Sequence, residues 1–375
     1  MNDVRSDYQR VHMDSALLFC VIFLVGIGIT MNYSASAVLS EDTYSDSYYY
    51  LKRSLLFASL GFAAMAATMK ISYVHYRRVV YPILLVAILL VGSVFIPGVG
   101  KTIGGATRWI NLAGIRFQPS EAAKVAMIIF LAYSLEKKSK KISSFAVGFL
   151  PHIVFMGVVA AFVLMQKDFG SAMTIAIITW FMMFVAGVKV KYLVGMFVAM
   201  LPLIFMLVSG SDYRKQRILS FMNPWSDQYG SGFQIIQSFV AFNQGGWLGK
   251  GLGQGQQKLF YLPEAHTDFI FSVIGEELGI LGISVVIALF CFFCYRGLKI
   301  SLNAPDLFGR YIAVGCTLLI GMEALLNMGV VMGLLPTKGL TLPFVSYGGS
   351  SLVVSLAAVG ILLNISTYKR VQGTL

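Results

Sequence analysis

The chain has 375 residues, of which 57% are hydrophobic and only 12% are charged. A soluble domain is about half apolar and about a quarter charged, so this composition excludes an ordinary soluble enzyme. The formal net charge is +12. The Lys and Arg residues gather at the ends of apolar blocks and not in one basic patch, so nucleic acid is not an expected partner.

The apolar residues fall in blocks long enough to cross a bilayer, which needs about 20 residues of helix. The chain is therefore predicted to be an all-α, polytopic membrane protein with about ten transmembrane helices. We expect residues 1–375 to form a single membrane-embedded domain. The predicted spans are residues 15–39, 52–70, 79–99, 120–135, 145–165, 171–188, 192–208, 269–295, 311–335 and 350–368.

The distribution of Lys and Arg predicts the orientation, because cytoplasmic loops carry an excess of these residues. With the N-terminus inside, the cytoplasmic pieces hold sixteen of them, and the outer pieces hold seven apart from the long 209–268 connection. Both termini are therefore predicted to be cytoplasmic. Residues 209–268 form a large periplasmic or extracellular loop. Long loops in compact proteins are often functional, so the outer face is the expected site of chemistry.

The first candidate cluster is the sequence GGATRWINLAGIRFQPSEAAK, which follows the third span. It contains Arg108, Trp109, Glu121 and Lys124. One interpretation is an amphipathic element at the outer interface with Trp109 as a headgroup-level anchor. The other is a site where Arg108 and Lys124 hold an anionic group while Glu121 orients Lys124 at spacing i, i+3.

The second cluster is the sequence LPEAHTDFIFSVIGEELG, which leads into the eighth span. Glu264, His266 and Asp268 precede the span, and Glu276 and Glu277 lie two turns inside it. Asp268 is expected at the helix N-terminus, where it would serve either as a cap or as a functional carboxylate. Glu276 and Glu277 need partners if they lie within the hydrocarbon.

The third cluster is the sequence LPTKGLTLPFVSYGGSS, between the last two spans. Its prolines and glycines predict a bent, re-entrant segment, which is tolerated at membrane depth only when it is buried in protein or lines a cavity. Lys338 is its one charge. Lys338 is either a solvated loop residue or a partner of Asp268, since both lie at outer ends of consecutive spans.

Several other polar residues have simpler interpretations. Glu323 and Asn327 lie one turn apart in the ninth span and are expected to satisfy each other or a neighbouring helix. Asp168 is expected in a tight outer turn that needs no catalytic explanation. The tyrosines of residues 44–50 are interpreted as an interfacial aromatic belt.

These motifs, in this order, resemble the SEDS family (shape, elongation, division and sporulation) of bacterial cell-wall polymerases. The similarity runs from about residue 15 to residue 370. It rests on GGATRWI, QPSE, NPWSDQYGSGFQIIQS, LPEAHTDFIFSVIGEELG and LPFVSYGGSS. The motifs PEAHTDF, IGEE and PTKGL are more similar to the division branch of the family than to the elongation branch. Relatives often have an amide in place of Glu323.

The resemblance implies a peptidoglycan glycosyltransferase that polymerises lipid II into glycan strands at the outer face of the bacterial cytoplasmic membrane, at the division septum. It implies that Asp268 is the essential acidic residue and that Arg108 and Trp109 are the outer-interface pair. The implied partners are lipid II, undecaprenyl-pyrophosphate-linked glycan, a class B penicillin-binding protein with transpeptidase activity, and other divisome membrane proteins.

A mechanism follows from these assignments. Asp268 is the expected general base for a sugar hydroxyl. The positively charged Arg108, Lys124 and Lys338 are expected to stabilise a leaving pyrophosphate, and Glu121, Glu264 and His266 complete the predicted substrate site. A divalent cation could share the charge-stabilising role, but the sequence contains no ligand set that demands one.

Three other functions stay open at this point. An elongation-type polymerase would share the architecture. A transporter or lipid II flippase would place charges near the bilayer midplane and show internal repeats, whereas the charges here cluster on the outer side of the membrane and the sequence shows no clear repeat. A non-catalytic scaffold for division proteins is the third.

Overall fold

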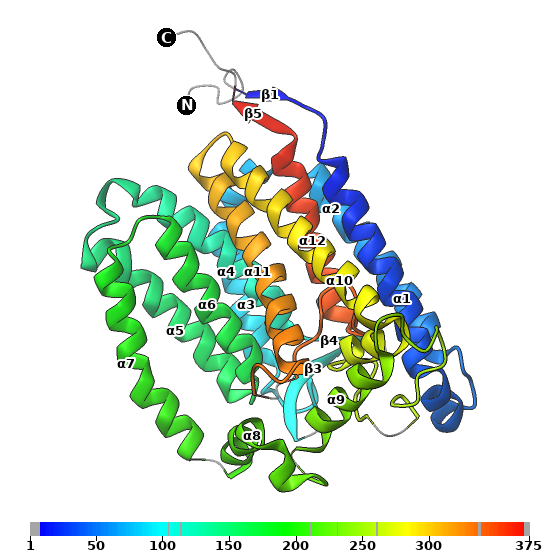
Figure 1. The fold of residues 1–375 in the computed structure, drawn as a ribbon. Coiled ribbons are helices and arrows are strands. Elements are labelled where there is room, and N and C mark those ends of the chain that lie inside the picture. Colours follow the sequence, from blue (N-terminus) through cyan, green and yellow to red (C-terminus); the bar gives the residue numbers. More distant parts are fainter. Residues whose placement is uncertain are drawn as a thin grey trace.

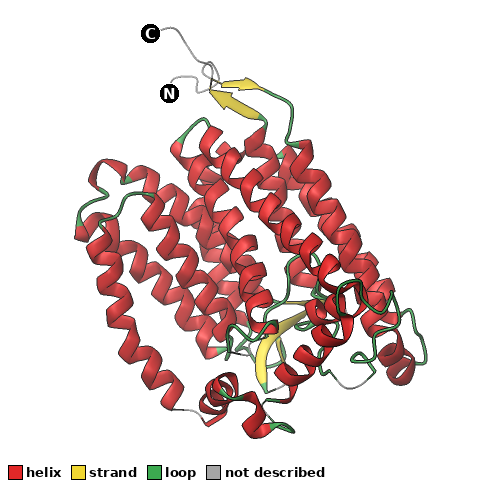
Figure 2. Cartoon of the chain, in the orientation of Figure 1, coloured by secondary structure: helices red, strands yellow, loops and turns green. Residues whose placement is uncertain are grey.

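The computed structural model describes residues 8–103, 105–112, 115–210, 212–230, 232–259, 262–336 and 339–370. Within these residues, each of the ten predicted spans corresponds to one helix, and the protein is mostly helical (Figure 2). The all-α, polytopic fold is therefore confirmed. The ten helices are α1 (Ser15–Tyr44), α2 (Tyr49–Lys70), α3 (Tyr76–Ser93), α4 (Pro119–Lys137), α5 (Leu150–Met165), α6 (Phe169–Val185), α7 (Val190–Ser209), α10 (Ile270–Asn303), α11 (Leu307–Val331) and α12 (Gly349–Ser366).

Short strands mark the two ends of the helical bundle. Strand β1 (Tyr8–Arg10) pairs antiparallel with β5 (Tyr368–Arg370), which holds both ends of the described chain at one end of the bundle (Figure 1). At the opposite end lies an antiparallel sheet of β2 (Gly100–Ile103), β3 (Ala106–Leu112) and β4 (Ile115–Phe117). The two ends of the described chain lie at the same end of the bundle because the number of spans between them is even.

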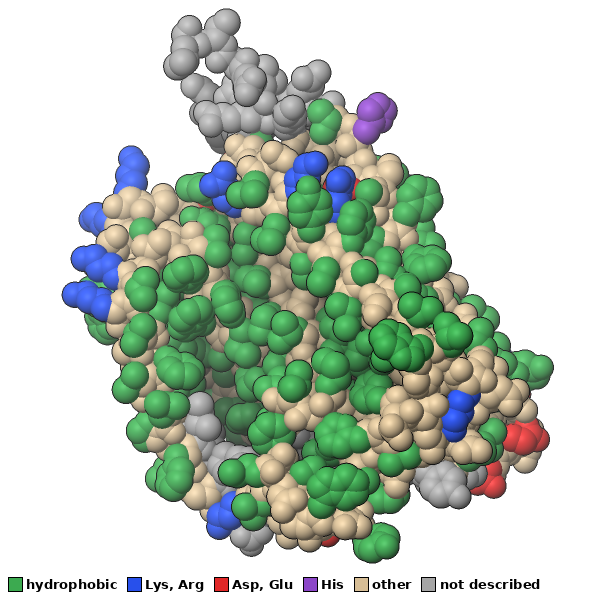
Figure 3. Space-filling model, viewed as in Figure 1, with side chains coloured by type: hydrophobic (Ala, Val, Ile, Leu, Met, Phe, Trp, Pro, Cys, Tyr) green, Lys and Arg blue, Asp and Glu red, His purple; other side chains and the backbone are tan. Residues whose placement is uncertain are grey.

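The flank of the bundle has the surface of a membrane protein. Six of the described helical segments are long and apolar enough to cross a bilayer, and α6 and part of α7 are shorter apolar helices. On the face drawn in Figure 3, the charged side chains lie towards the two ends, and hydrophobic side chains cover the flank between them. The more polar α2 and α4 pack against other helices, and in α4 protein surrounds the charged Glu121 and Lys124.

Small residues allow the helices to approach closely, as is common in membrane bundles. Gly360 of α12 faces α2, and a Cβ atom there would lie 2.0 Å from Thr68 Oγ1 and 2.3 Å from the Met65 carbonyl oxygen. The interior is formed largely by α4, α11 and α12, whose buried side chains are contiguous with those of α1 and α10.

The long outer connection folds back onto the bundle. It contains α8 (Asp212–Met222) and α9 (Phe233–Gly245), and α9 packs on α10. The helix α10 is broken at Gly279, whose backbone is left-handed with φ 65°. The turn after α9 fills this break, because Ile280 N donates to the Gly246 carbonyl at 2.9 Å and Lys250 N donates to the Glu276 carbonyl at 3.0 Å. The first two turns of α10 are thus fixed to the outer connection.

Both carboxylates beside this break have the partners that their depth requires. Glu277 accepts hydrogen bonds from Lys258 Nζ at 2.6 Å and from Ser34 Oγ, and the Ser34 bond ties α10 to α1. Glu276 accepts from the backbone N–H of Gln256 at 2.8 Å and from Lys250 Nζ at 3.2 Å. The expectation that these two residues would be paired is confirmed.

The predicted orientation can be tested with fusions at the two ends of the bundle. A periplasm-dependent reporter fused after Gly210 or Gly253 should be active, and one fused after Lys140 or Asn303 should not. The reason is the sixteen-to-seven excess of Lys and Arg on the predicted cytoplasmic side. A cytoplasm-dependent reporter at the same four positions is the control, and its activity at Gly253 would overturn the placement of the β2–β4 end outside.

Candidate functional site

A cavity of about 480 Å³ opens at the end of the bundle that carries the β2–β4 sheet. It is lined by segments far apart in the chain, from the start of α2 to the start of α12. Seven of the eight predicted site residues line it; Lys338 lies outside the described residues. The seven are Arg108, Trp109, Glu121, Lys124, Glu264, His266 and Asp268.

Asp268 does not cap a helix. The N-cap of α10 is Phe269, and no side chain bonds to the first turn. The cap interpretation is therefore wrong, and the Asp268 carboxyl is left to line the cavity. Gly339 lies directly against it, since a Cβ atom at Gly339 would be 2.9 Å from Asp268 Oδ2. A side chain at position 339 would displace the Asp268 carboxyl from its present position, so the re-entrant segment passes next to Asp268 at Gly339.

The backbone around Asp268 is fixed by side chains from other segments. Asn327 of α11 donates to the Asp268 carbonyl at 2.9 Å and to the Leu340 carbonyl at 2.6 Å. Ser346 Oγ donates to the Thr267 carbonyl at 2.5 Å, and Tyr347 N donates to the His266 carbonyl at 3.0 Å. Contrary to expectation, the Asn327 amide thus bonds neither Glu323 nor a neighbouring helix but two non-helical segments, and its Oδ1 has no partner among the described residues. The re-entrant segment and the segment before α10 form one wall of the cavity.

The environment of Asp268 favours its neutral form. Burial, the largest cause, and the charge of Glu264 raise the pKa of this carboxyl to about 7, against the opposing charges of Arg217 and Arg108. Burial also lowers the pKa of His266 below its ordinary value. A carboxyl with a pKa near neutral pH is suited to accept a proton and release it again.

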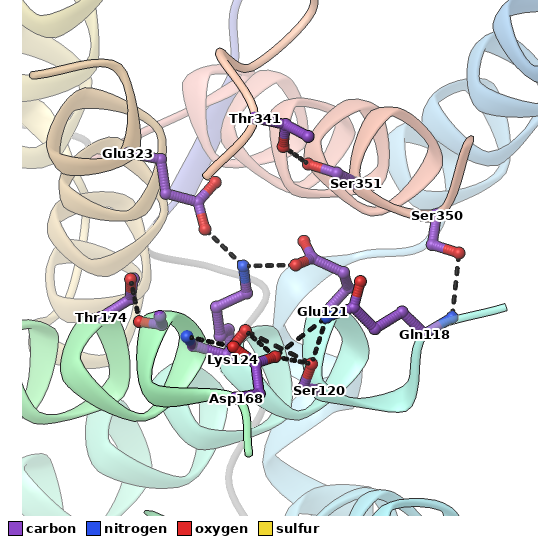
Figure 4. Close-up of polar contacts among 12 residues, drawn as sticks. Gln118, Ser120, Glu121, Lys124, Asp168, Thr174, Glu323, Thr341, Ser350 and Ser351 are labelled. Carbon is purple, nitrogen blue, oxygen red and sulfur yellow. Dashed lines mark hydrogen bonds and ion pairs between the residues drawn. The ribbon is translucent and has the colours of Figure 1, made fainter. Parts of the chain in front are cut away.

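Lys124 is buried between two carboxylates (Figure 4). Its ammonium donates to Glu121 Oε1 at 2.8 Å, which confirms the expected contact at spacing i, i+3. It also forms an ion pair with Glu323 of α11. Glu323 is therefore paired with Lys124 of the neighbouring helix α4, which confirms one of the two expected arrangements. The charge of Lys124 is fully compensated, so this residue holds α4 against α11 at the floor of the cavity.

Asp168 also lines the cavity, although it was expected in a tight outer turn without a catalytic role. It caps α6 by accepting from Ser171 N at 3.0 Å, and it accepts from Gln118 Nε2 at 2.9 Å (Figure 4). Burial alone would raise its pKa, but the hydrogen bonds from Ser171 and the charge of Arg108 hold the pKa below its ordinary value. Asp168 is thus a permanent negative charge beside the cavity, unlike Asp268.

The segment expected to be an amphipathic interfacial element is the β2–β4 sheet. Arg108 and Trp109 are adjacent on β3, and both line the cavity. The Arg108 guanidinium is held by the Lys167 carbonyl through Nη2 at 2.7 Å, while its buried Nε has no partner among the described residues. Arg108 therefore keeps donor capacity at the cavity, where its charge acts on both Asp168 and Asp268.

Other lining residues were not predicted as site residues. Arg53, Arg116, Gln118 and Tyr347 line the cavity, and the motifs QPSE and SYGGSS could have indicated the last two. Arg53 and Arg116 add positive charge. Within the described residues, no three His, Cys, Asp or Glu side chains come together as metal ligands would; the divalent cation stays a prediction.

A family model described as cell cycle protein, FtsW/RodA/SpoVE, matches residues 15–371. The chain belongs to this family. It is 50% identical over 361 residues to a probable peptidoglycan glycosyltransferase FtsW of Geobacter metallireducens, covering 96% of each chain. It is 43% identical to stage V sporulation protein E of Bacillus subtilis, covering 96% of this chain and 99% of that protein.

Solved structures of the family share the fold. One is a chain of a peptidoglycan synthase complex described as coordinating polymerisation and crosslinking, with a TM-score of 0.78 and 28% identity over 94% of this chain and 97% of that one. Another is the rod shape determining protein RodA of Thermus thermophilus, with a TM-score of 0.70 and 27% identity over 96% and 98%. The fold and the family expected from the motifs are confirmed.

The role of Asn327 can be tested by stability. Asn327→Leu leaves the Asp268 and Leu340 carbonyls without a donor, and each unsatisfied buried acceptor costs about 1–3 kcal/mol. We expect a clearly lower thermal unfolding midpoint in detergent. The control is Asn303→Leu, an exposed residue at the other end of α10. Equal midpoints for the two variants would contradict the structural role given to Asn327.

Proposed function

We propose that this cavity is where the chain, a peptidoglycan glycosyltransferase, joins lipid II units into glycan strands at the outer face of the membrane, with Asp268 as general base. The observation that carries the proposal is the position of Asp268. Its carboxyl does not cap α10 and lines a cavity that also holds three arginines. The names of relatives about half identical to this chain support the reaction.

The proposed step is a displacement at the anomeric carbon of the donor sugar. Asp268 takes the proton of the acceptor hydroxyl while its oxygen forms the new glycosidic bond. The bond between the donor sugar and its pyrophosphate breaks, and the electron pair leaves with the pyrophosphate. General base catalysis of this kind contributes about 10²–10⁴-fold. Asp168 does not suit this role, because its low pKa makes it a weak base.

The leaving pyrophosphate needs positive charge that is not already compensated. Lys124 is paired with two carboxylates, so we assign the anion mainly to Arg108, with Arg53 and Arg116 on the same cavity. Lys338 would join them if it pairs with Asp268 as predicted, and the close contact of Gly339 with Asp268 supports that placement. A divalent cation, if bound, would supply further charge to the same anion.

The cellular role and the partners are proposed from the relatives. Close relatives carry the name FtsW, which supports septal division over elongation. A family member has been solved in a peptidoglycan synthase complex that coordinates polymerisation with crosslinking. We therefore propose a class B penicillin-binding protein with transpeptidase activity as partner, together with other divisome membrane proteins.

Substitution of Asp268 tests the catalytic assignment. Asp268→Asn should insert and fold normally but polymerise lipid II at least about 100-fold more slowly, because an amide cannot accept the proton. The measurement uses the purified chain with lipid II, alone and with its cognate penicillin-binding protein. The matched control is Asp42→Asn, an exposed outer carboxylate that does not line the cavity.

Two outcomes would count against this assignment. Normal polymerisation by Asp268→Asn would exclude the general base. Movement of lipid II across vesicles by the wild-type protein without any glycan product would favour the flippase instead. The same assay with a labelled lipid II in proteoliposomes separates these results.

The pH dependence follows from the raised pKa of Asp268. The base must be ionised, so the rate should rise with pH through about 7 and fall to roughly a tenth of its plateau one unit below that value. Initial rates between pH 5.5 and 8.5 provide the profile. The residual rate of Asp268→Asn should lack this limb, and an identical limb in that variant would assign the titration to another group.

A further inference from the structure

Four tyrosines form a continuous aromatic wall on one side of the cavity; we call Tyr44, Tyr49, Tyr50 and Tyr347 the tyrosine wall. Tyr44 and Tyr49 stack with ring centroids 3.8 Å apart. Tyr50 meets the other three edge-on, at 6.1 Å from Tyr44, 5.3 Å from Tyr49 and 5.0 Å from Tyr347. Edge-to-face pairs of this kind are favourable, so the rings fix one another in place.

The wall is part of the cavity and not of a lipid-facing belt. All four rings line the cavity that contains Asp268. Tyr44 keeps 45% of its surface exposed there, while Tyr49 also contacts the Arg53 guanidinium at 4.8 Å. The nearby Tyr48 is different, because it stacks on Tyr33 at 5.6 Å and does not line the cavity. The belt interpretation therefore fits Tyr48 but not the four wall residues.

The wall reaches the catalytic segment directly. The Tyr50 ring lies 4.7 Å from the imidazole of His266, two residues before Asp268. At the same point Tyr347 N donates to the His266 carbonyl at 3.0 Å. A ligand resting on the wall would therefore have one end beside the Asp268 carboxyl and the other towards Tyr44, at the outer end of α1.

We propose that the tyrosine wall is a carbohydrate subsite that holds sugar rings of the acceptor glycan next to Asp268. A pyranose ring has apolar C–H faces and a rim of hydroxyl groups. Tyrosine matches both, because its ring face packs against C–H groups and its phenol hydroxyl donates and accepts hydrogen bonds. A lipid tail would need no hydroxyls, and a pyrophosphate would need cations.

The acceptor is assigned to this wall because of the position of the base. The acceptor hydroxyl must lie within hydrogen-bond distance of Asp268, and the sugar that bears it then rests against His266 and Tyr50. The second sugar of the acceptor would extend along Tyr44 towards the outer surface. Holding this sugar orients its hydroxyl for attack. This assignment rests on the proposed glycosyltransferase function.

The test measures binding without turnover. In the Asp268→Asn background, calorimetry with a lipid-free tetrasaccharide of peptidoglycan measures glycan affinity of the full chain in detergent. Adding Tyr44→Ala should weaken binding about tenfold, the effect typical of removing an aromatic anchor. Tyr44→Phe should lie between the two, since it keeps the ring and loses the hydroxyl. Tyr48→Ala is the matched control and should bind like its parent.

Polymerisation in the Asp268-intact protein gives the second measurement. The tetrasaccharide should compete with lipid II, and Tyr44→Ala should require about tenfold more of it for half inhibition, whereas Tyr48→Ala should not. Equal thermal unfolding midpoints for Tyr44→Ala and Tyr48→Ala show that both variants are folded.

Failure of the subsite and failure of the proposed function give different results. If the wild type polymerises lipid II but Tyr44→Ala and Tyr48→Ala bind and compete alike, the wall is only an interfacial feature and the subsite is refuted. If the wild type makes no glycan, the glycosyltransferase function fails. The binding series then still decides whether the wall recognises sugar.

Discussion

Backbone that is not helical must find its hydrogen-bond partners inside the protein when it lies at membrane depth, and Asn327 supplies two of them. Its amide joins the carbonyl of Asp268 to that of Leu340. Ser346 adds a third bond, to Thr267. Through these contacts the segment before α10, the C-terminal end of α11 and the re-entrant segment are bonded to one another. These hydrogen bonds also determine the position of the Asp268 carboxyl, because Asp268 lies before α10 and is not held by a regular helix.

The charged groups of the cavity divide into compensated and uncompensated sets. Lys124 is enclosed by Glu121 and Glu323, and loss of one partner of such a buried group is costly because the other charge remains buried. Asp168 is fixed by Ser171 and Gln118. Their contacts hold α4, α6 and α11 together at the floor of the cavity. No Lys or Arg among the described residues forms an ion pair with Asp268, so burial dominates its pKa and leaves its proton exchangeable.

Hydropathy was enough to predict the ten spans, although α2 and α4 are more polar than the others, and local spacing was enough to predict the contact between Glu121 and Lys124. The three-dimensional pairings were not accessible in this way. Glu323 lies 199 residues from Lys124, and no local pattern relates them. The cap expected for Asp268 failed because α10 begins two residues later, after an irregular turn fixed by Asn327. Asp168 was missed because a buried N-cap and a surface turn have the same sequence.

The tyrosines are a second case in which the local sequence did not predict the three-dimensional contacts. A run of tyrosines at the end of a span predicts an interfacial belt, and for Tyr48, which is exposed and does not line the cavity, this stays a prediction. The neighbouring Tyr49 and Tyr50 differ only in the direction of their side chains, which depends on the turn between α1 and α2 and on the approach of the re-entrant segment. Tyr347 belongs to that segment and packs against Tyr50, so that both rings line the cavity. The bonds that position Asp268 therefore also position the aromatic surface beside it, since Tyr347 immediately follows Ser346.

A substrate with an apolar tail, a charged pyrophosphate and a sugar has to meet three different surfaces at once. The lipid-facing flank, the arginines and the tyrosine wall provide them in one place, where the bundle meets the outer surface.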